Sequence, residues 1–274
     1  MELAVQDTTK PDQPGGADPA EHPFDLRGRT AIVTGGNGGI GFGMAAGLVA
    51  AGARVTIVGR NPAKNENAVA KLRAGGGEVL SIGADLTRED DCGRIIRETV
   101  ARFGGLDVLV NNAGANDRKP PERYSLPEWN ALLAANLTSA FLCSQAAFPE
   151  MVARGRGKII NIGSMLSLFG ASFAAPYAAS KGGLVQMSKS LASAWAKHNI
   201  QVNAVLPGWI DTDLTARAKQ QVEGLHDRVL LRTPARRWGT PGDFAGIAVF
   251  LSSPASDFIT GAAIPVDGGY SAEG

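Results

Sequence analysis

The sequence is poor in the residue types that bind metals or form disulfides. Its 274 residues include two cysteines, Cys92 and Cys143, and three histidines, His22, His198 and His226. Neither the cysteine spacing nor the scattered histidines match a metal or redox motif, so we expect no metal site. Two cysteines also argue against a disulfide framework and favour a reducing compartment, and we expect a cytoplasmic protein.

An excess of one charge sign and long apolar runs are also lacking. Lys plus Arg number 27 and Asp plus Glu number 26, which leaves a net charge of +1 and gives no bulk attraction to nucleic acid or to an anionic membrane. No unbroken apolar run reaches the about 18 residues that a membrane span needs, so we expect no membrane partner. Residues 1–23 are rich in proline and acids and lack the apolar stretch of a signal peptide. We therefore expect a disordered tail over residues 1–23 and one domain over residues 24–274.

Aromatic residues are scarce at 6%, while hydrophobic residues reach 44%. The apolar mass is mostly Ala, Val, Leu and Ile, which suits closely packed helices and strands. The 35 glycines exceed the usual share of about 7%, and their lack of a three-residue period excludes collagen.

Short β-branched runs alternate with longer stretches of helical period from Arg29 onward. The expected strands are Thr30–Val33, Arg54–Val58, Glu78–Gly83, Val108–Asn111, Lys158–Ile162, Gln201–Leu206 and Ala263–Val266. The expected helices are Ile40–Ala51, Pro62–Ala74, Arg88–Phe103, Pro127–Ala153, Tyr177–Lys197 and Pro241–Leu251. This alternation predicts a single-domain α/β fold, a Rossmann-like doubly wound parallel sheet of about seven strands with helices on both faces.

Two local signals refine this prediction. Thr87, Ser125 and Thr240 precede helices and are expected to cap them. The polar stretch at about residues 213–238 has helical character and interrupts the alternation. Insertions at such a place are usually lids, and we expect one here.

A glycine-rich turn follows the first strand. The run Thr34–Gly41 contains five glycines and leads into a helix. Glycine permits a left-handed backbone and lets N–H groups approach a pyrophosphate at the helix N-terminus. The flanking strand and helix therefore indicate a dinucleotide-binding turn, and a tight turn without a ligand is the alternative. The expected cofactor contacts are Gly35, Asn37, Gly38, Gly39, Ile40 and Gly41.

The end of the second strand bears on the choice of dinucleotide. NAD-binding folds carry an acid about 20 residues after the glycines, where it holds the ribose 2′-hydroxyl. Here the first acid after Gly41 is Glu66, and the strand instead ends in Gly59, Arg60 and Asn61. Because a guanidinium suits a 2′-phosphate, we expect NADP with Arg60 and Asn61 as contacts. NAD is the alternative cofactor, and an ordinary exposed turn is the alternative for Arg60.

A tyrosine and a lysine lie one helical turn apart at Tyr177 and Lys181. Their spacing places the phenol and the ammonium on one face, where the charge is expected to lower the tyrosine pKa from about 10. That change suits a general acid and base near neutral pH. Ser164 follows the carboxyl end of a strand, where α/β sheets bind ligands, so its hydroxyl can flank the same substrate oxygen. A surface Tyr–Lys pair is the alternative.

Together these motifs resemble the short-chain dehydrogenase/reductase superfamily in order and spacing. The matching residues are Thr34-Gly-x-x-x-Gly39-x-Gly41, Asn111-Asn112-Ala113-Gly114, Asn136, Ser164, Tyr177-x-x-x-Lys181 and Pro207-Gly208. The resemblance covers about Phe24 to Tyr270. It implies an NADP-dependent enzyme that interconverts a secondary alcohol and a ketone by hydride transfer. A dinucleotide-binding module without catalysis is the alternative, but the residues whose loss would indicate it are present.

The resemblance also implies roles for the matching residues. Tyr177 exchanges the proton with the substrate oxygen. Lys181 lowers the pKa of Tyr177 and binds the nicotinamide ribose, and Ser164 hydrogen-bonds to the substrate oxygen. Asn136 holds a water that links Lys181 to solvent. The further cofactor contacts are Asp85 and Leu86 at the adenine, Asn112, Ala113 and Gly114 at the floor, and Pro207, Gly208, Ile210 and Thr212, of which Thr212 binds the carboxamide. One departure is that Gly38 stands where NADP-dependent members often carry a basic residue.

Within the superfamily the chain looks most like sugar-acid and polyol ketoreductases such as gluconate 5-dehydrogenase, and it is also similar to glucose dehydrogenase-like and 3-oxoacyl-carrier-protein reductase-like members. Bases outnumber acids between Thr215 and Arg237, which favours an anionic sugar acid, with a solvated lid face as the alternative. Residues of the loop after Gly114 are expected within reach of the substrate, namely Asn116, Arg118 and Lys119. Apolar residues after Ser164 leave a 3-oxoacyl thioester or cyclic ketone as the alternative substrate; they are Met165, Leu166, Leu168 and Phe169.

Two predicted helices, Pro127–Ala153 and Tyr177–Lys197, are apolar on more than one face. A helix of this kind is buried on more than its sheet side, so a partner subunit is expected. The resemblance implies a homotetramer in which the segment Ile259–Tyr270 packs at a second interface.

Overall fold

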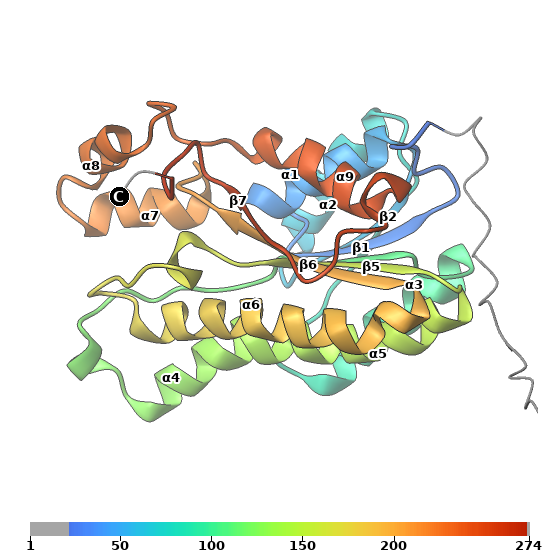
Figure 1. Ribbon diagram of the computed structural model, residues 1–274, viewed down its shortest axis with the longest axis horizontal. Helices are drawn as coiled ribbons and strands as arrows, with labels where there is room; N and C mark the ends of the chain where they lie inside the picture. Colours follow the sequence, from blue (N-terminus) through green and yellow to red (C-terminus); the bar gives the residue numbers. More distant parts are fainter. Residues whose placement is uncertain (1–21, 273–274) are drawn as a thin grey trace, which may run out of the picture.

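The computed structural model describes residues 22–272, and the expected tail over residues 1–23 lies almost wholly outside the described residues. One parallel sheet has the strand order β3-β2-β1-β4-β5-β6-β7 (Figure 1). The strands are β1 Thr30–Thr34, β2 Arg54–Val58, β3 Val79–Ile82, β4 Val108–Asn111, β5 Gly157–Ile162, β6 Ile200–Pro207 and β7 Ala263–Val266. Each lies within one residue, at either end, of the strand that the sequence predicts.

The sheet is covered on both faces, which confirms the doubly wound α/β prediction. The helices α1 Gly39–Ala50, α2 Pro62–Ala74 and α9 Ala245–Ser252 lie on one face, and α3 Glu89–Phe103, α5 Ser139–Ala153 and α6 Ala175–Trp195 lie on the other (Figure 1). The central strands β1, β4, β5 and β6 therefore bury every residue, as parallel strands between two helical layers do. Adjacent strands β1 and β4 mark the point where the strand order reverses, and ligands bind at such a point.

The long helix predicted over Pro127–Ala153 is interrupted. It consists of α4 Leu126–Leu133, a π-helical segment Ala134–Thr138, and α5. The wide turn in its middle is not visible in apolar periodicity, because the residues on both sides keep a helical pattern. By length and composition alone the run Leu126–Ala153 could cross a membrane. It packs against α3, α6 and the sheet, so it is a core helix of this domain.

The predicted caps have mixed outcomes. Ser125 and Thr240 each form a capping box, with Glu128 and Asp243 respectively, as predicted. The prediction for Thr87 is wrong, because α3 begins after Arg88 without a side-chain cap and the Thr87 hydroxyl donates to Asp85 instead.

The segment 213–238 forms α7 Asp213–Gln221 and α8 Leu225–Arg232 at the carboxyl edge of the sheet, on the left of Figure 1. It has a small core of its own, made of Ala218, Leu225, Val229 and Trp238. This core makes the segment a compact unit.

Elsewhere, Cys92 of α3 and Cys143 of α5 meet as buried free thiols that hydrogen-bond to each other.

Candidate active site

The turn after β1 has the geometry of an anion cradle. Gly35 and Gly39 have positive φ angles of 64° and 51°, which favour glycine. A Cβ on Gly41 would lie 2.4 Å from the Gly35 carbonyl oxygen, so a side chain does not fit there. Gly38 caps α1 without a side-chain hydrogen bond, and a Cβ there would meet nothing within 4 Å. No side chain therefore caps the first-turn N–H groups of α1, which can donate to a phosphate ligand.

The end of β4 holds this turn in place. The Asn112 Nδ2 donates to the carbonyls of Thr34 at 2.9 Å and Gly35 at 3.2 Å. In return the Thr34 hydroxyl accepts from the N–H groups of Asn112 at 2.9 Å and Ala113 at 3.0 Å. Asn112 is thus committed to the backbone of the turn, and the supporting role of the Thr34 hydroxyl was not predicted. A threonine at a strand end carries no signal of this role in one sequence.

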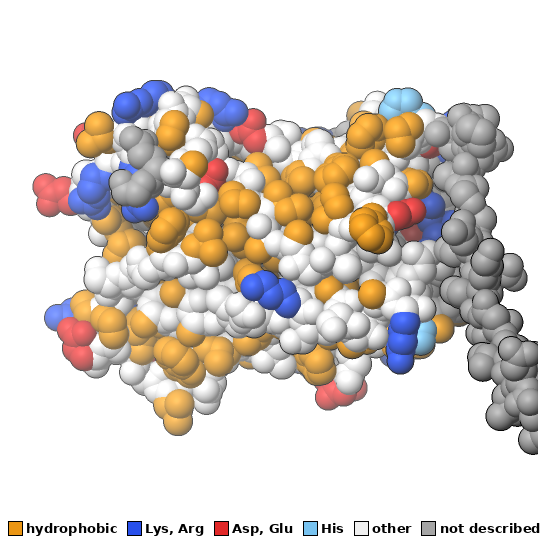
Figure 2. Space-filling model, viewed as in Figure 1, with side chains coloured by type: hydrophobic (Ala, Val, Ile, Leu, Met, Phe, Trp, Pro, Cys, Tyr) orange, Lys and Arg blue, Asp and Glu red, His pale blue; other side chains and the backbone are white. Residues whose placement is uncertain are grey.

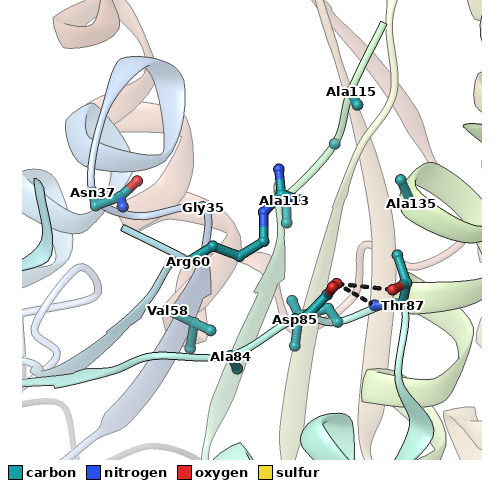
Figure 3. Close-up of a pocket in the computed structure, with 13 residues that line it drawn as sticks. Gly35, Asn37, Val58, Arg60, Ala84, Asp85, Thr87, Ala113, Ala115 and Ala135 are labelled. Carbon is teal, nitrogen blue, oxygen red and sulfur yellow. Dashed lines mark hydrogen bonds between the residues drawn. The ribbon is translucent and has the colours of Figure 1, made fainter. Parts of the chain in front are cut away.

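A cavity of about 250 Å³ lies beside the turn, between the ends of β1, β2, β3 and β4 (Figure 3). Figure 3 shows Arg60 reaching from the end of β2 toward Ala113, with Asp85 lower in the same cavity. The Asp85 carboxylate accepts from the Thr87 hydroxyl at 2.8 Å and from its N–H at 3.1 Å. These bonds, aided by the Arg60 charge, lower the pKa of Asp85. The cavity therefore combines a fixed carboxylate with an exposed guanidinium.

The residue before Arg60 is a glycine because of packing. A Cβ on Gly59 would lie 2.2 Å from the Asn37 Nδ2 and 2.6 Å from the Asn65 Oδ1. Those two amides are hydrogen-bonded to each other at 2.7 Å. An acid that could hold a ribose 2′-hydroxyl would have to displace these two amides. The donor set and the missing acid fit a nucleotide with a 2′-phosphate.

The structure places Asn61 differently from the prediction. Its Oδ1 accepts from the Lys64 N–H at 3.0 Å and caps α2. Asn61 lines an outer groove along α2 and not the cavity that holds Arg60. Asn61 thus has a structural role as the cap of α2, and its predicted cofactor contact remains a prediction.

A second cavity, of about 340 Å³, joins the glycine turn to Tyr177, Lys181 and Ser164. Ser164 follows β5 and hydrogen-bonds to Tyr177, which stands in the first turn of α6. The Lys181 ammonium is 5.7 Å from the center of the Tyr177 ring and donates to the Ile162 carbonyl at 2.6 Å. The three side chains that the sequence singles out therefore meet at the carboxyl edge of the sheet.

Burial dominates the proton affinities of this group. It raises the pKa of Tyr177, against the opposing effects of the Ser164 hydrogen bond and the Arg118 charge. Burial also lowers the pKa of Lys181 to about 8, since its side chain is only 4% exposed. The expected lowering of the Tyr177 pKa by Lys181 is thus wrong for this chain alone. Sequence spacing shows the neighbouring charge but not the removal of water.

Asn136 lies in the π-helical segment, and such segments often occur at functional sites. Its Oδ1 accepts from the Ala115 N–H at 2.8 Å and its Nδ2 donates to the Ala115 carbonyl at 2.9 Å. The same Nδ2 donates to Ser180 at 3.2 Å. Asn136 thereby ties the loop after β4 to α6, and its predicted water remains a prediction.

These residues can now be compared with known proteins. A family model described as enoyl-(acyl carrier protein) reductase matches residues 35–271. The 2-dehydro-3-deoxy-D-gluconate 5-dehydrogenase of Escherichia coli (strain K12) is 42% identical over 248 residues, which are 90% of this chain and 97% of that protein. The chain belongs to the short-chain dehydrogenase/reductase superfamily.

Further relatives fall in the same group of this superfamily. The 5-keto-D-gluconate 5-reductase of the same organism is 41% identical over 246 residues, 90% of this chain and 96% of that protein. The crystal structure of a gluconate 5-dehydrogenase from Burkholderia cenocepacia J2315 in complex with NADP and tartrate aligns with a TM-score of 0.87. That protein is 39% identical, and the alignment covers 92% of this chain and 98% of that one.

Most of the predicted cofactor residues line the two cavities. Those lining the cavity beside Arg60 include Gly35, Asn37, Asp85, Leu86, Ala113 and Gly114. Those lining the cavity beside Tyr177 also include Gly38, Gly39, Ile40, Asn112, Lys181, Pro207, Gly208, Ile210 and Thr212. Gly41 lines neither cavity, and it packs against the Gly35 carbonyl and the Asn112 side chain. Lining residues that the sequence did not single out include Lys64, Ala115, Ala135 and Asp213.

Arg118 lies in the loop after β4 and is close enough to Tyr177 for their charges to interact. It is half-buried, burial lowers its pKa, and it interacts electrostatically with Tyr177. Its Nη1 donates to Gln221 of α7 at 3.4 Å. Its Nε, like the Oδ1 of Asn116, is buried without a hydrogen-bond partner among the described residues. Unsatisfied buried polar atoms at a site mark places for ligand groups.

Other predicted substrate contacts are occupied by the protein itself. Lys119 pairs with Glu128 at 2.5 Å and Asp117 at 3.2 Å, so its charge is not directed at the cavity. Cations of the segment 213–238 also have structural partners. Lys219 pairs with Asp211, Arg237 pairs with Asp243, and Arg232 stacks on Phe169 and Tyr270. The charge excess of this segment therefore does not by itself identify a sugar acid.

Proposed function

We propose that this chain is an NADP-dependent oxidoreductase that interconverts a secondary alcohol and a ketone on a sugar acid. The observation that carries the substrate class is Arg118, a half-buried guanidinium beside the Tyr177 phenol. A guanidinium binds a carboxylate through charge-assisted and often bidentate hydrogen bonds. The names of the relatives support the same class, and the related Burkholderia enzyme was solved with tartrate, a hydroxy acid.

The residues present fit NADP. The uncapped N-terminus of α1 suits the diphosphate, and Arg60 lies where a 2′-phosphate needs a cation. When bound, the nicotinamide supplies the hydride acceptor for the alcohol or the hydride donor for the ketone. The crystal structure of the Burkholderia relative contains NADP.

The chain's own residues handle the proton. In the reductive direction the Tyr177 hydroxyl donates its proton to the substrate oxygen, and in the oxidative direction the phenolate accepts it. Ser164, already bonded to Tyr177, donates to the same oxygen and orients it. Lys181, held by the Ile162 carbonyl at 2.6 Å, keeps a titratable ammonium close to the phenol. Arg118 fixes the carboxylate end of the substrate, which positions its hydroxyl at Tyr177.

Two of the apolar residues after Ser164 pack within the protein and are not available to a 3-oxoacyl thioester or a cyclic ketone. Met165 is buried in a core cluster, and Phe169 packs on Tyr270. Leu168 is 52% exposed and remains available to such substrates. These classes therefore stay in the test as alternatives.

The test is a panel of aldonic acids, their keto forms, polyols, cyclic alcohols and 3-oxoacyl thioesters, followed at the nicotinamide absorbance with NADP(H) and NAD(H). We expect the highest kcat/KM with a hydroxy or keto acid and NADP(H). Turnover of the thioesters or cyclic alcohols alone would assign the alternative class. Tight nucleotide binding without turnover of any class would favour a binding module.

The homotetramer and the cytoplasmic location belong to the same proposal. Figure 2 shows apolar side chains gathered along α9 and β7 in the middle of one face. Exposed apolar residues also lie at the start of α4, on α5 and next to the segment Ile259–Tyr270; they are Leu126, Phe141, Val152 and Phe258. Such patches favour symmetric partner subunits. Light scattering should give four times 28.4 kDa, and a mass near one chain would contradict the assembly.

A further inference from the structure

An ion pair spans the cofactor cleft between the nucleotide-binding half and the lid. Lys64 stands in the first turn of α2, and its Nζ lies 2.7 Å from the Oδ2 of Asp213, the first residue of α7. The lid also touches the glycine turn next to this pair, because a Cβ on Gly39 would lie 3.2 Å from the Thr212 methyl group. The pair therefore sits directly beside the phosphate-binding turn.

Both charges face the space that the cofactor's phosphates require. Lys64 and Asp213 line the cavity formed by Gly38, Gly39 and Lys181, and they also line the outer groove along α2. Their side chains are 58% and 88% exposed. An ion pair this exposed contributes little to stability, about 0–1 kcal/mol, so either partner can be exchanged at small cost.

The other ammonium of this cavity is already engaged. Lys181 is buried and donates to the Ile162 carbonyl, whereas the Lys64 side chain is 58% exposed to solvent. An incoming diphosphate competes with the Asp213 carboxylate for Lys64. The Asp213 carboxylate, in the same cavity, also repels that diphosphate.

We propose that Lys64 is a cofactor-binding residue whose ammonium exchanges Asp213 for the dinucleotide diphosphate, and that Asp213 is its internal competitor. This inference rests on the proposed function. It predicts opposite effects for the two partners, since removing Lys64 removes an attraction and removing the Asp213 charge removes a competitor. A pair that only straps the lid closed predicts effects of the same sign.

The test measures equilibrium binding of NADPH and NADH, without substrate, by nicotinamide fluorescence. We expect Lys64→Gln to weaken both nucleotides about five- to tenfold, because a diphosphate is common to both. Asp213→Asn should tighten both about two- to fivefold, and both shifts should shrink in high salt. Lys71→Gln, which changes a lysine that lines the same groove from the same helix, is the matched control and should leave both affinities unchanged.

Each contrary result has a distinct meaning. If both Lys64→Gln and Asp213→Asn weaken nucleotide binding, the competition is overturned and the ion pair only holds the lid closed. Unchanged affinity in Lys64→Gln, with normal wild-type binding, would overturn the inference alone. A wild type that binds neither nucleotide would overturn the proposed function together with it. Melting temperatures of all variants verify that each one is folded.

Discussion

The two halves of the cleft bind charge by different means. In the nucleotide half, Arg60 and Lys64 stay exposed, and the phosphate donors are backbone N–H groups at the start of α1. In the catalytic half, Lys181 and Asn136 are 4% and 1% exposed. Burial shifts the pKa values of Tyr177 and Lys181 in the catalytic half. The difference separates recognition, which tolerates water, from proton transfer, which depends on its removal.

The largest effect is expected in the catalytic half. Replacing Tyr177 with Phe removes the proton donor next to Ser164 and should lower kcat about 10²–10⁴-fold, with NADPH affinity unchanged. Steady-state kinetics and nucleotide titration measure the two quantities. Tyr124→Phe is the matched control, because its hydroxyl donates to the Asp117 carbonyl in the nearby loop. A kcat near the wild-type value in Tyr177→Phe would remove Tyr177 from the proposed chemistry.

The next effect concerns the substrate side of the same half. Arg118→Ala leaves a substrate carboxylate without its cation and should raise KM for a sugar acid about 100-fold, or about 3 kcal/mol. Turnover of a neutral polyol should change far less. Arg123→Ala, in an exposed arginine of the same loop, is the control. Equal losses for the acid and the polyol would contradict a carboxylate contact.

The features that could be predicted from the sequence are those that depend on local backbone geometry. Glycine positions such as Gly35 and Gly41 could be predicted because the required backbone admits almost no other residue. The strands could be predicted because burial on both faces favours short runs that are mostly apolar and β-branched. These features depend on local geometry, which a single sequence carries.

The features that were missed depend on tertiary contacts. The pKa direction of Tyr177 follows from burial by α6 and neighbouring loops, and Lys64 meets Asp213 across the cleft from a distant part of the chain. The π-helical segment around Asn136 interrupts a helix whose apolar pattern continues through it. These features have no local signature, whereas the cap that Asn61 forms on α2 has one, an asparagine directly before Pro62.

Burial of the Lys181 ammonium should also lower the free energy of unfolding by a measurable amount. Its pKa falls to about 8 in the folded chain, whereas an unfolded lysine has a value of about 10.4. Between these values the unfolded state binds more protons, so this group makes the wild type more stable as pH rises from 8 toward 10. Lys181→Met should therefore be inactive but about 1–2 kcal/mol more stable at pH 7, with the gain shrinking at pH 9.5.

Urea denaturation at the two pH values measures this difference. Lys189→Met, in an exposed lysine of the same helix, should show no such dependence on pH. A gain from Lys181→Met that is equal at pH 7 and pH 9.5 would mean that the ammonium of Lys181 is not the source of the cost.

The smallest effect is expected for the exposed cation of the nucleotide half. Arg60 and Asp85 line the same cavity, and Gly59 stands where NAD would need an acid, packed against the Asn37 and Asn65 amides. Arg60→Ala should weaken NADPH about tenfold and leave NADH nearly unchanged, because only NADPH carries the 2′-phosphate. Fluorescence titration of both nucleotides measures the ratio, with Lys71→Ala as the control. Equal weakening of NADPH and NADH would assign Arg60 to the shared part of the nucleotide, and the preference for NADP would then depend on the missing acid alone.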